Sequence, residues 1–138
     1  MGASHAIGHQ LGPLGVGHGE TSCIMLPHVL KYNYLHSSPS SSIHTNQQKV
    51  LSVLWAQPTT FSMLISRGLN RETADAGEVI GALVSELGMP RTLREVGVGE
   101  DKLDNLAENS MKDRWLPTNP VRLTEKGMVM EILRMALG

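Results

Sequence analysis

The stretch TADAGEVIGALVSELG at residues 73–88 decides the fold class, because its apolar side chains recur every three or four positions. This spacing places them on one face of an α-helix; they are Val79, Ile80, Leu83, Val84 and Leu87. Thr73 is the expected N-cap. Asp75 and Glu78 lie in the early turns, where the positive end of the helix dipole stabilises acidic side chains. The Gly-Met-Pro sequence at 88–90 gives the expected stop. We predict a helix over residues 73–88.

The same period recurs in the rest of the chain. A second predicted helix covers residues 100–112, with Leu103, Leu106, Ala107, Ser110 and Met111 on one face, and the last segment repeats the pattern with Val129, Ile132, Leu133 and Ala136. Weaker helical patterns cover 47–55 and 60–68, and the spacing at 92–95 is that of a capping box. No strand-like alternation, hairpin dipeptide or glycine-rich nucleotide loop is present. We therefore predict the all-α class, as a helical bundle.

Composition and charge exclude several classes of protein. The chain has 138 residues, with 12 Lys and Arg against 13 Asp and Glu and a net charge of -1. This length fits one domain, and no basic block is present to bind nucleic acid or an anionic membrane. No apolar run is long enough to span a bilayer, no secretory leader is visible, and the single Cys23 excludes an intrachain disulfide. We expect a soluble, cytoplasmic protein without nucleic-acid or membrane partners.

Three histidines near the amino terminus form the candidate site. His5 and His9 lie four positions apart, so on a helix both imidazoles leave the same face. His18 follows a turn rich in Gly and Pro and precedes a predicted helix over residues 20–32, so the chain can fold it back toward the first pair. Three converging imidazoles suit a divalent cation such as Fe(II) or Zn(II). The same pattern also fits ordinary surface or hydrogen-bonded histidines, and spacing does not separate the two interpretations.

The remaining histidines and the serine-rich stretch are interpreted as structural. His28, inside the predicted 20–32 helix, is expected to have a packing or surface role, whereas His36 and His44 are expected to be exposed. The run SSPSSS at residues 37–42 cannot bury apolar surface, so we predict a solvated loop there. This loop belongs to a serine-rich insertion at about residues 34–45.

Several motifs occur together in a fixed order. They are GASHAIGHQLG at residues 2–12, GHG at 17–19, IMLPHVLKYN at 24–33, LGMPRTL at 87–93 and TNP at 118–120. In this order they resemble the carboxy-terminal helical domain of the iron-containing (group III) alcohol dehydrogenases, with the maleylacetate reductase-like branch nearest. The resemblance covers nearly the whole chain except about residues 34–45.

The resemblance implies that residues 1–138 are a single partial helical metal-binding domain with the fold of the dehydroquinate synthase-like carboxy-terminal domain. The amino-terminal α/β nucleotide-binding domain, which would bind NAD(P), is expected to be missing. By the same resemblance, His5 and His18 are metal ligands that act with an Asp and a His from an earlier helix. His9, beside the metal and the nicotinamide, is implied to be a catalytic and cofactor-binding residue that helps in proton transfer or positioning.

Two functional hypotheses follow. In the first, the chain is the carboxy-terminal part of a metal-dependent, NAD(P)-linked oxidoreductase of the alcohol dehydrogenase or maleylacetate reductase type. Its Fe(II) or Zn(II) would act as a Lewis acid while hydride passes between nicotinamide and a small alcohol or carbonyl substrate. This requires pairing with an amino-terminal half, in addition to any homodimer. In the second, the chain is a catalytically inactive helical fragment that acts as an interaction module, with exposed helix faces. A free-standing metal-binding domain is a third alternative.

Overall fold

Seven α-helices and four short 3₁₀ segments make up the computed structural model, which describes residues 1–138 and contains no strand. The α-helices are α1 (Ala3–Leu11), α2 (His18–Leu35), α3 (Ser42–Ala56), α4 (Pro58–Ser66), α5 (Ala76–Glu86), α6 (Leu103–Ser110) and α7 (Lys126–Leu137). The 3₁₀ segments are η1 (Gly12–Leu14), η2 (Arg94–Val96), η3 (Glu100–Lys102) and η4 (Leu116–Thr118). The predicted all-α class is confirmed.

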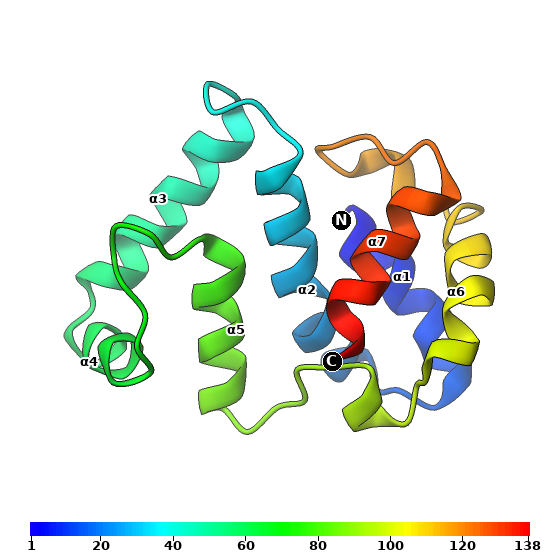
Figure 1. Cartoon of the computed structure of the whole chain (residues 1–138), viewed down its shortest axis with the longest axis horizontal. Coiled ribbons are helices and arrows are strands. Elements are labelled where there is room, and N and C mark those ends of the chain that lie inside the picture. The colour runs from blue at the N-terminus through cyan, green and yellow to red at the C-terminus, as the bar shows by residue number, and fades with distance from the viewer.

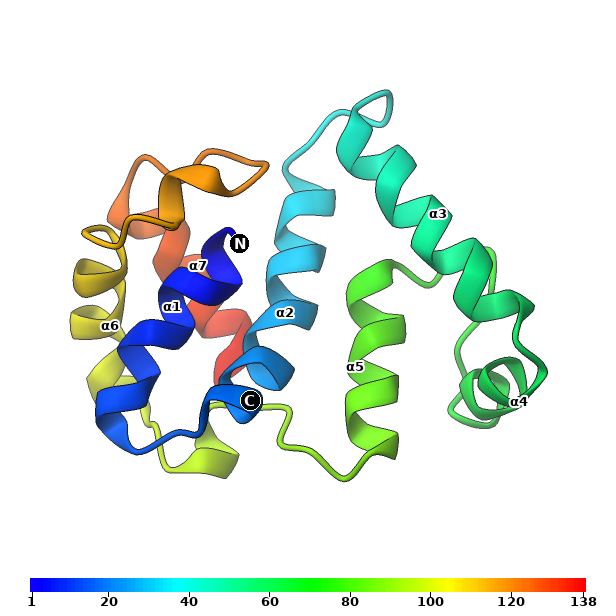
Figure 2. The same cartoon turned by 180° about the vertical axis from the view of Figure 1, so that it is seen from behind.

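Helix α2 lies between two groups of helices (Figures 1 and 2). On one side are α1, α6 and α7; on the other side α5 packs against α2, with α3 and α4 farther out. The first group surrounds an apolar cluster of 21 buried residues, to which α2 contributes Ile24, Met25, Val29 and Tyr32. The second group encloses a cluster of only 7: Leu51, Trp55, Leu64, Ala74, Ala76, Val79 and Ala82. The histidines of α1 therefore lie on the better packed side of the molecule.

The helix predicted over residues 73–88 is present, but Thr73 is not its N-cap. Helix α5 begins at Ala76 and Asp75 caps it, because the Glu78 amide donates to the Asp75 carboxylate at 2.8 Å. The Glu78 carboxylate in turn accepts the Asp75 amide at 2.9 Å, which completes a capping box. An ionised carboxylate with a reciprocal Glu partner outcompetes a threonine two residues earlier.

The helix expected over residues 20–32 is longer than predicted. Helix α2 begins at His18, where the Gly17 amide donates to the Glu20 carboxylate at 3.0 Å, and it ends at Leu35. It continues through Pro27, whose carbonyl oxygen faces α5. A Cβ added at Gly77 would overlap that oxygen, so glycine at this position permits the close approach of α2 and α5.

Most of the weaker expectations also have a counterpart in the structure. The segment predicted at 100–112 divides into η3 and α6, which ends two residues before the predicted end. The weak pattern at 47–55 lies in α3, and that at 60–68 lies in α4 up to the end of this helix at Ser66; both helices begin earlier than predicted. The predicted capping box at 92–95 starts η2, with the Glu95 amide 3.3 Å from Thr92 Oγ1. No helix has the length and apolar character needed to cross a membrane. A cytoplasmic location stays a prediction.

The serine-rich stretch connects α2 to α3. Only residues 36–41 lie outside the two helices, and Ser41 caps α3 by accepting the His44 amide at 3.5 Å. His36 is exposed, as expected. His44 is half-buried, contrary to expectation, because its ring stacks on Tyr34 with the centroids 4.1 Å apart. The His44 Nε2 also lies 3.0 Å from the Tyr34 carbonyl oxygen.

Candidate functional site

The three histidines predicted as a site come together where the face of α1 that carries His5 and His9 meets the start of α2. The ring centroids of His5 and His9 are 4.4 Å apart, and those of His5 and His18 are 5.6 Å apart. His5 is the central ring of the three. It is half-buried, while His9 and His18 are exposed, so the cluster opens to solvent.

The amino terminus of α1 is fixed by residues from the other end of the chain. The Gly2 amide donates to Thr118 Oγ1 at 3.1 Å, and the Ala3 amide donates to Asn119 Oδ1 at 3.2 Å. Gly2 itself offers no side chain for capping, so these distant residues satisfy amides that the helix leaves free. The buried Asn119 also donates to Asn33 Oδ1 at 2.7 Å, which ties α1 to α2. Thr118 and Asn119, together with Asn33 of α2, thus hold in place the helix that carries His5 and His9.

Helices α1 and α2 cross closely near the cluster because Gly8 has no side chain. A Cβ at Gly8 would lie 3.1 Å from Thr21 Oγ1. The Thr21 hydroxyl donates to the His18 carbonyl oxygen at 2.8 Å, which braces the first turn of α2. Glu20 is committed to capping this turn through the Gly17 amide. It therefore does not act as a carboxylate of the histidine cluster.

The electrostatic setting keeps the central imidazole neutral. Partial burial lowers the pKa of His5, and the neighbouring His9 and His18 lower it further, which outweighs the opposite effect of Asp113. A neutral imidazole has a free nitrogen lone pair, which is the form that binds a metal ion. The donor chemistry of the cluster therefore fits a borderline transition metal. Within the chain itself, however, no group of three or more His, Cys, Asp or Glu side chains is placed to hold a metal ion.

The sequence patterns gave no sign of three consecutive residues next to the cluster, Asp113, Arg114 and Trp115. The Asp113 carboxylate lies 2.9 Å from His9 Nδ1, although 104 positions separate the two residues. The Trp115 ring meets His5 edge-on, with the centroids 6.1 Å apart, and the Arg114 guanidinium lies 5.1 Å from the Trp115 centroid. No spacing rule links these residues to the histidines. They lie between α6 and η4, and the packing of both of these segments on α1 brings them to the histidines.

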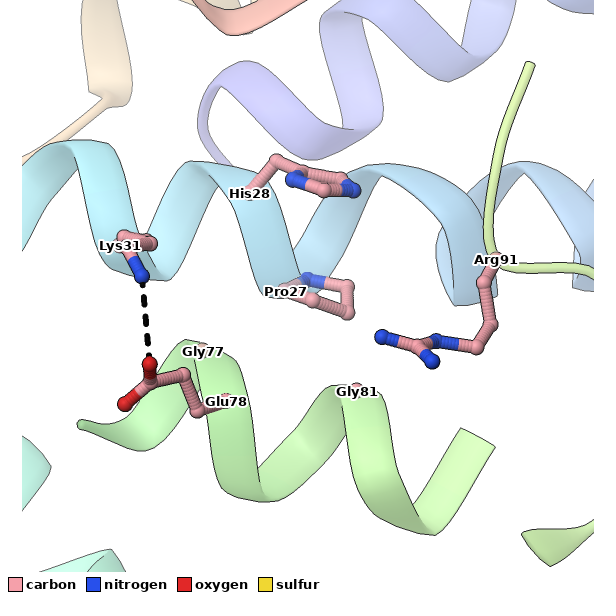
Figure 3. A pocket seen from close by; sticks show the side chains of 7 residues that line it. All are labelled: Pro27, His28, Lys31, Gly77, Glu78, Gly81 and Arg91. Carbon is pink, nitrogen blue, oxygen red and sulfur yellow. Dashed lines mark hydrogen bonds and ion pairs between the residues drawn. The ribbon is translucent and has the colours of Figure 1, made fainter. Parts of the chain in front are cut away.

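A separate polar pocket of about 160 Å³ lies between α2 and α5 (Figure 3). Its lining consists of Pro27, His28, Lys31, Gly77, Glu78, Gly81 and Arg91. Lys31 pairs with Glu78 at 3.4 Å and with Asp75 at 3.6 Å, and the Arg91 side chain extends over Gly81. His28 is half-buried here, in agreement with its expected packing or surface role. None of the three clustered histidines lines this pocket.

Nearly the whole chain matches the model of one known protein family. Residues 1–137 match the model described as "Fe-containing alcohol dehydrogenase family, C-terminal". The chain is 48% identical over 136 residues to Dehydrogenase FUM7 of Gibberella moniliformis, covering 99% of this chain and 31% of that protein. The chain thus spans about a third of the length of the curated relatives it matches.

Solved structures share the fold. The crystal structure of a 1,3-propanediol oxidoreductase superposes with a TM-score of 0.68 at 30% identity, covering 99% of this chain and 33% of that chain. The maleylacetate reductase from Agrobacterium tumefaciens superposes with a TM-score of 0.57 at 27% identity, covering 99% and 32%. These matches agree with the resemblance seen in the sequence motifs. They give no support to zinc in place of iron.

Proposed function

The chain belongs to the Fe-containing alcohol dehydrogenase family, whose C-terminal part it matches, and we propose that it is the metal-binding helical part of an NAD(P)-linked oxidoreductase. The observation that carries this proposal is the convergence of His5, His9 and His18 at the junction of α1 and α2. Helical bundle cores and domain edges commonly build such sites from side chains on facing helices.

In this proposal His5 and His18 supply two of the iron ligands. The remaining ligands, an Asp and a His, would be supplied by an earlier helix of the full-length protein. When bound, iron would polarise the oxygen of an alcohol or carbonyl substrate. His9, on the same face of α1 as His5, is proposed to contact the substrate and the nicotinamide and to exchange a proton with the substrate oxygen.

A chimera tests this proposal. This chain replaces the matching carboxy-terminal part of Dehydrogenase FUM7, so that the nucleotide-binding half is supplied by a protein 48% identical over the exchanged region. The purified chimera is loaded with Fe(II), and NAD(P)H formation is followed by absorbance with a panel of small alcohols. We expect about one iron per chain and alcohol-dependent hydride transfer.

Variants of the chimera assign the result to the histidines. His18→Ala is expected to lose stoichiometric iron and to lower the rate by more than about a hundredfold. The matched control is His36→Ala, because His36 is exposed at the far end of α2 and pairs with Glu131 instead of the cluster. A folded, iron-containing chimera without hydride transfer, or equal losses in the two variants, would refute the proposal.

One observation favours a second candidate function, a catalytically inactive interaction module. Apolar side chains on α3 and α4 are between 41% and 62% exposed: Val50, Val53, Phe61 and Ile65. If these side chains form a contiguous patch, that patch is the kind of surface at which soluble proteins bind partners. An iron-free chimera that forms a specific complex through these helices would favour this second function.

A further inference from the structure

His9, one of the two exposed histidines of the cluster, has the largely shielded carboxylate of Asp113 behind it. His9 Nδ1 lies 2.9 Å from Asp113 Oδ2, a distance at which a hydrogen bond is well formed. The side chain of His9 is 38% exposed, but that of Asp113 is only 10% exposed. One edge of the imidazole is therefore fixed inside the protein, while the opposite edge is free to meet a ligand.

The Asp113 carboxylate is itself held in one orientation. Its Oδ1 accepts the Trp115 amide at 2.8 Å, and its Oδ2 accepts the Gln10 side-chain amide at 3.4 Å in addition to His9. Burial alone would raise the pKa of Asp113, but the hydrogen bonds from Trp115 and His9, together with the charge of Arg114, lower it below its ordinary value. Asp113 is thus ionised at neutral pH and can only accept hydrogen bonds.

An acceptor at this position determines which nitrogen of His9 carries the proton. Because Oδ2 cannot donate, the His9 Nδ1 must be the donor, and in a neutral ring the lone pair is then on Nε2. We propose that Asp113 is a positioning residue that holds His9 as the Nδ1–H tautomer, so that Nε2 accepts the hydroxyl proton of an alcohol substrate. This inference rests on the proposed function for its substrate, but the tautomer can be measured independently of activity.

With these roles of His9 and Asp113, each bond that breaks in the substrate has a group that takes up its proton or its hydride. During alcohol oxidation the substrate O–H bond breaks and its proton moves to His9 Nε2. The carbinol C–H bond would break with its electron pair, a bound oxidised nicotinamide would accept the hydride, and the carbonyl product would remain. The ionised Asp113 stabilises the imidazolium that forms. The partly exposed ring then releases the proton to solvent, and carbonyl reduction uses the same positions in reverse.

Substitution of Asp113 by asparagine should reverse the tautomer. The Trp115 amide requires an acceptor, so the asparagine carbonyl oxygen should take the Oδ1 position and its NH₂ group the Oδ2 position. An NH₂ group facing His9 can only donate, which forces Nδ1 to accept and places the proton on Nε2. Asp104→Asn is the matched control, because this carboxylate lies on α6, is 72% exposed and pairs with Lys126.

The experiment is long-range ¹⁵N–¹H correlation NMR on the ¹⁵N-histidine-labelled 138-residue chain near pH 8, with His9 assigned by a His9→Gln variant. We expect His9 as the Nδ1–H tautomer in the unsubstituted chain and in Asp104→Asn, and as the Nε2–H tautomer in Asp113→Asn. An Nε2–H tautomer in the unsubstituted chain, or an Nδ1–H tautomer in folded Asp113→Asn, would overturn the inference. Circular dichroism shows whether Asp113→Asn folds. If it does not fold, the spectrum of the unsubstituted chain still tests whether His9 is the Nδ1–H tautomer.

A second readout separates this inference from the proposed function. In an active chimera, Asp113→Asn should lower kcat by about a hundredfold with little change in KM or iron content. An inactive chimera with the expected tautomer would overturn the proposed function and leave the Asp113 contact intact. An active chimera with an unchanged kcat in Asp113→Asn would overturn the positioning role alone.

Discussion

At the scale of single residues, His28 links the stability of the chain to pH. Burial lowers its pKa, and the nearby Arg91 and Lys31 charges add to this effect, although a backbone hydrogen bond to Arg91 opposes it. In the unfolded chain the histidine takes up a proton near its ordinary pKa of about 6.5. Between that value and the lower folded pKa, the unfolded state binds more protons, so the free energy of unfolding falls as the pH falls.

The variant His28→Gln should therefore flatten the pH dependence of stability. Urea unfolding at pH 7.5 and pH 5.5 is expected to show a loss of stability on acidification for the unsubstituted chain and a smaller loss for His28→Gln. At pH 7.5 His28 is neutral in both the folded and the unfolded state, so any difference between the two proteins there reports changed packing and the changed hydrogen bond to Arg91. An equal acid-induced loss in the two proteins would contradict this prediction.

The candidate site shows what single-residue patterns can reveal. The spacing of His5 and His9 and the turn before His18 predicted their convergence, because helix periodicity and glycine turns are local properties. The partner of His9 could not be predicted in this way. Asp113 lies between Lys112 and Arg114 in an ordinary charged sequence, and only tertiary packing gives it a role.

At the scale of elements, the contact between α2 and α5 depends on one glycine. A methyl group at Gly77 would overlap the Pro27 carbonyl oxygen and lie 3.0 Å from the Lys31 Cβ. Backbone atoms on both helices must then move apart, because a carbonyl in a helix cannot rotate away as a flexible side chain can. The other glycine facing this contact, Gly81, has more room, since its nearest neighbour would be 3.7 Å away.

We predict that Gly77→Ala lowers the free energy of unfolding by about 1–3 kcal/mol through overpacking. The control is Gly127→Ala in α7, where no atom lies within 4 Å of the added Cβ. That change should leave stability unchanged or raise it by up to about 0.5–1 kcal/mol, since alanine favours helix more than glycine. Both values come from urea unfolding. Similar effects of the two substitutions would show that the helix contact adjusts freely.

Sequence patterns predicted the elements better than their boundaries. The period of 79–87 identified α5, although only Val79 and Val84 of the predicted apolar face are buried and Leu87 is 76% exposed. The start of the helix depended on two competing caps, Thr73 and Asp75. Likewise, α2 runs through Pro27 to Leu35, beyond its predicted end. A proline costs a helix about 3 kcal/mol in isolation. Here the packing of both faces of α2 outweighs that cost, and no local signal reports such packing.

At the scale of the whole molecule, the two sides of α2 differ in how well they are packed. The side with α1, α6 and α7 has 21 buried apolar residues, and the side with α3, α4 and α5 has 7. Helix α3, on the side of the smaller cluster, also has two buried polar atoms without hydrogen-bond partners, Gln47 Oε1 and Trp55 Nε1. Less apolar burial and unsatisfied polar groups both reduce local stability. The histidine cluster thus lies on the side of the molecule that should remain ordered longest.

This difference predicts that the chain opens in two stages under native conditions. Helix α4 buries only Leu64, whereas α7 buries Val129, Ile132, Leu133, Ala136 and Leu137. Backbone amides of α3 and α4 should therefore exchange with deuterium at least about tenfold faster than those of α7, after correction for intrinsic rates, because local opening exposes little apolar surface there. Peptide-level exchange measured by mass spectrometry gives both values in one experiment. Uniform protection across α3, α4 and α7 would instead show that the two clusters unfold as one cooperative unit, with α2 transmitting the stability of the larger cluster to the smaller one.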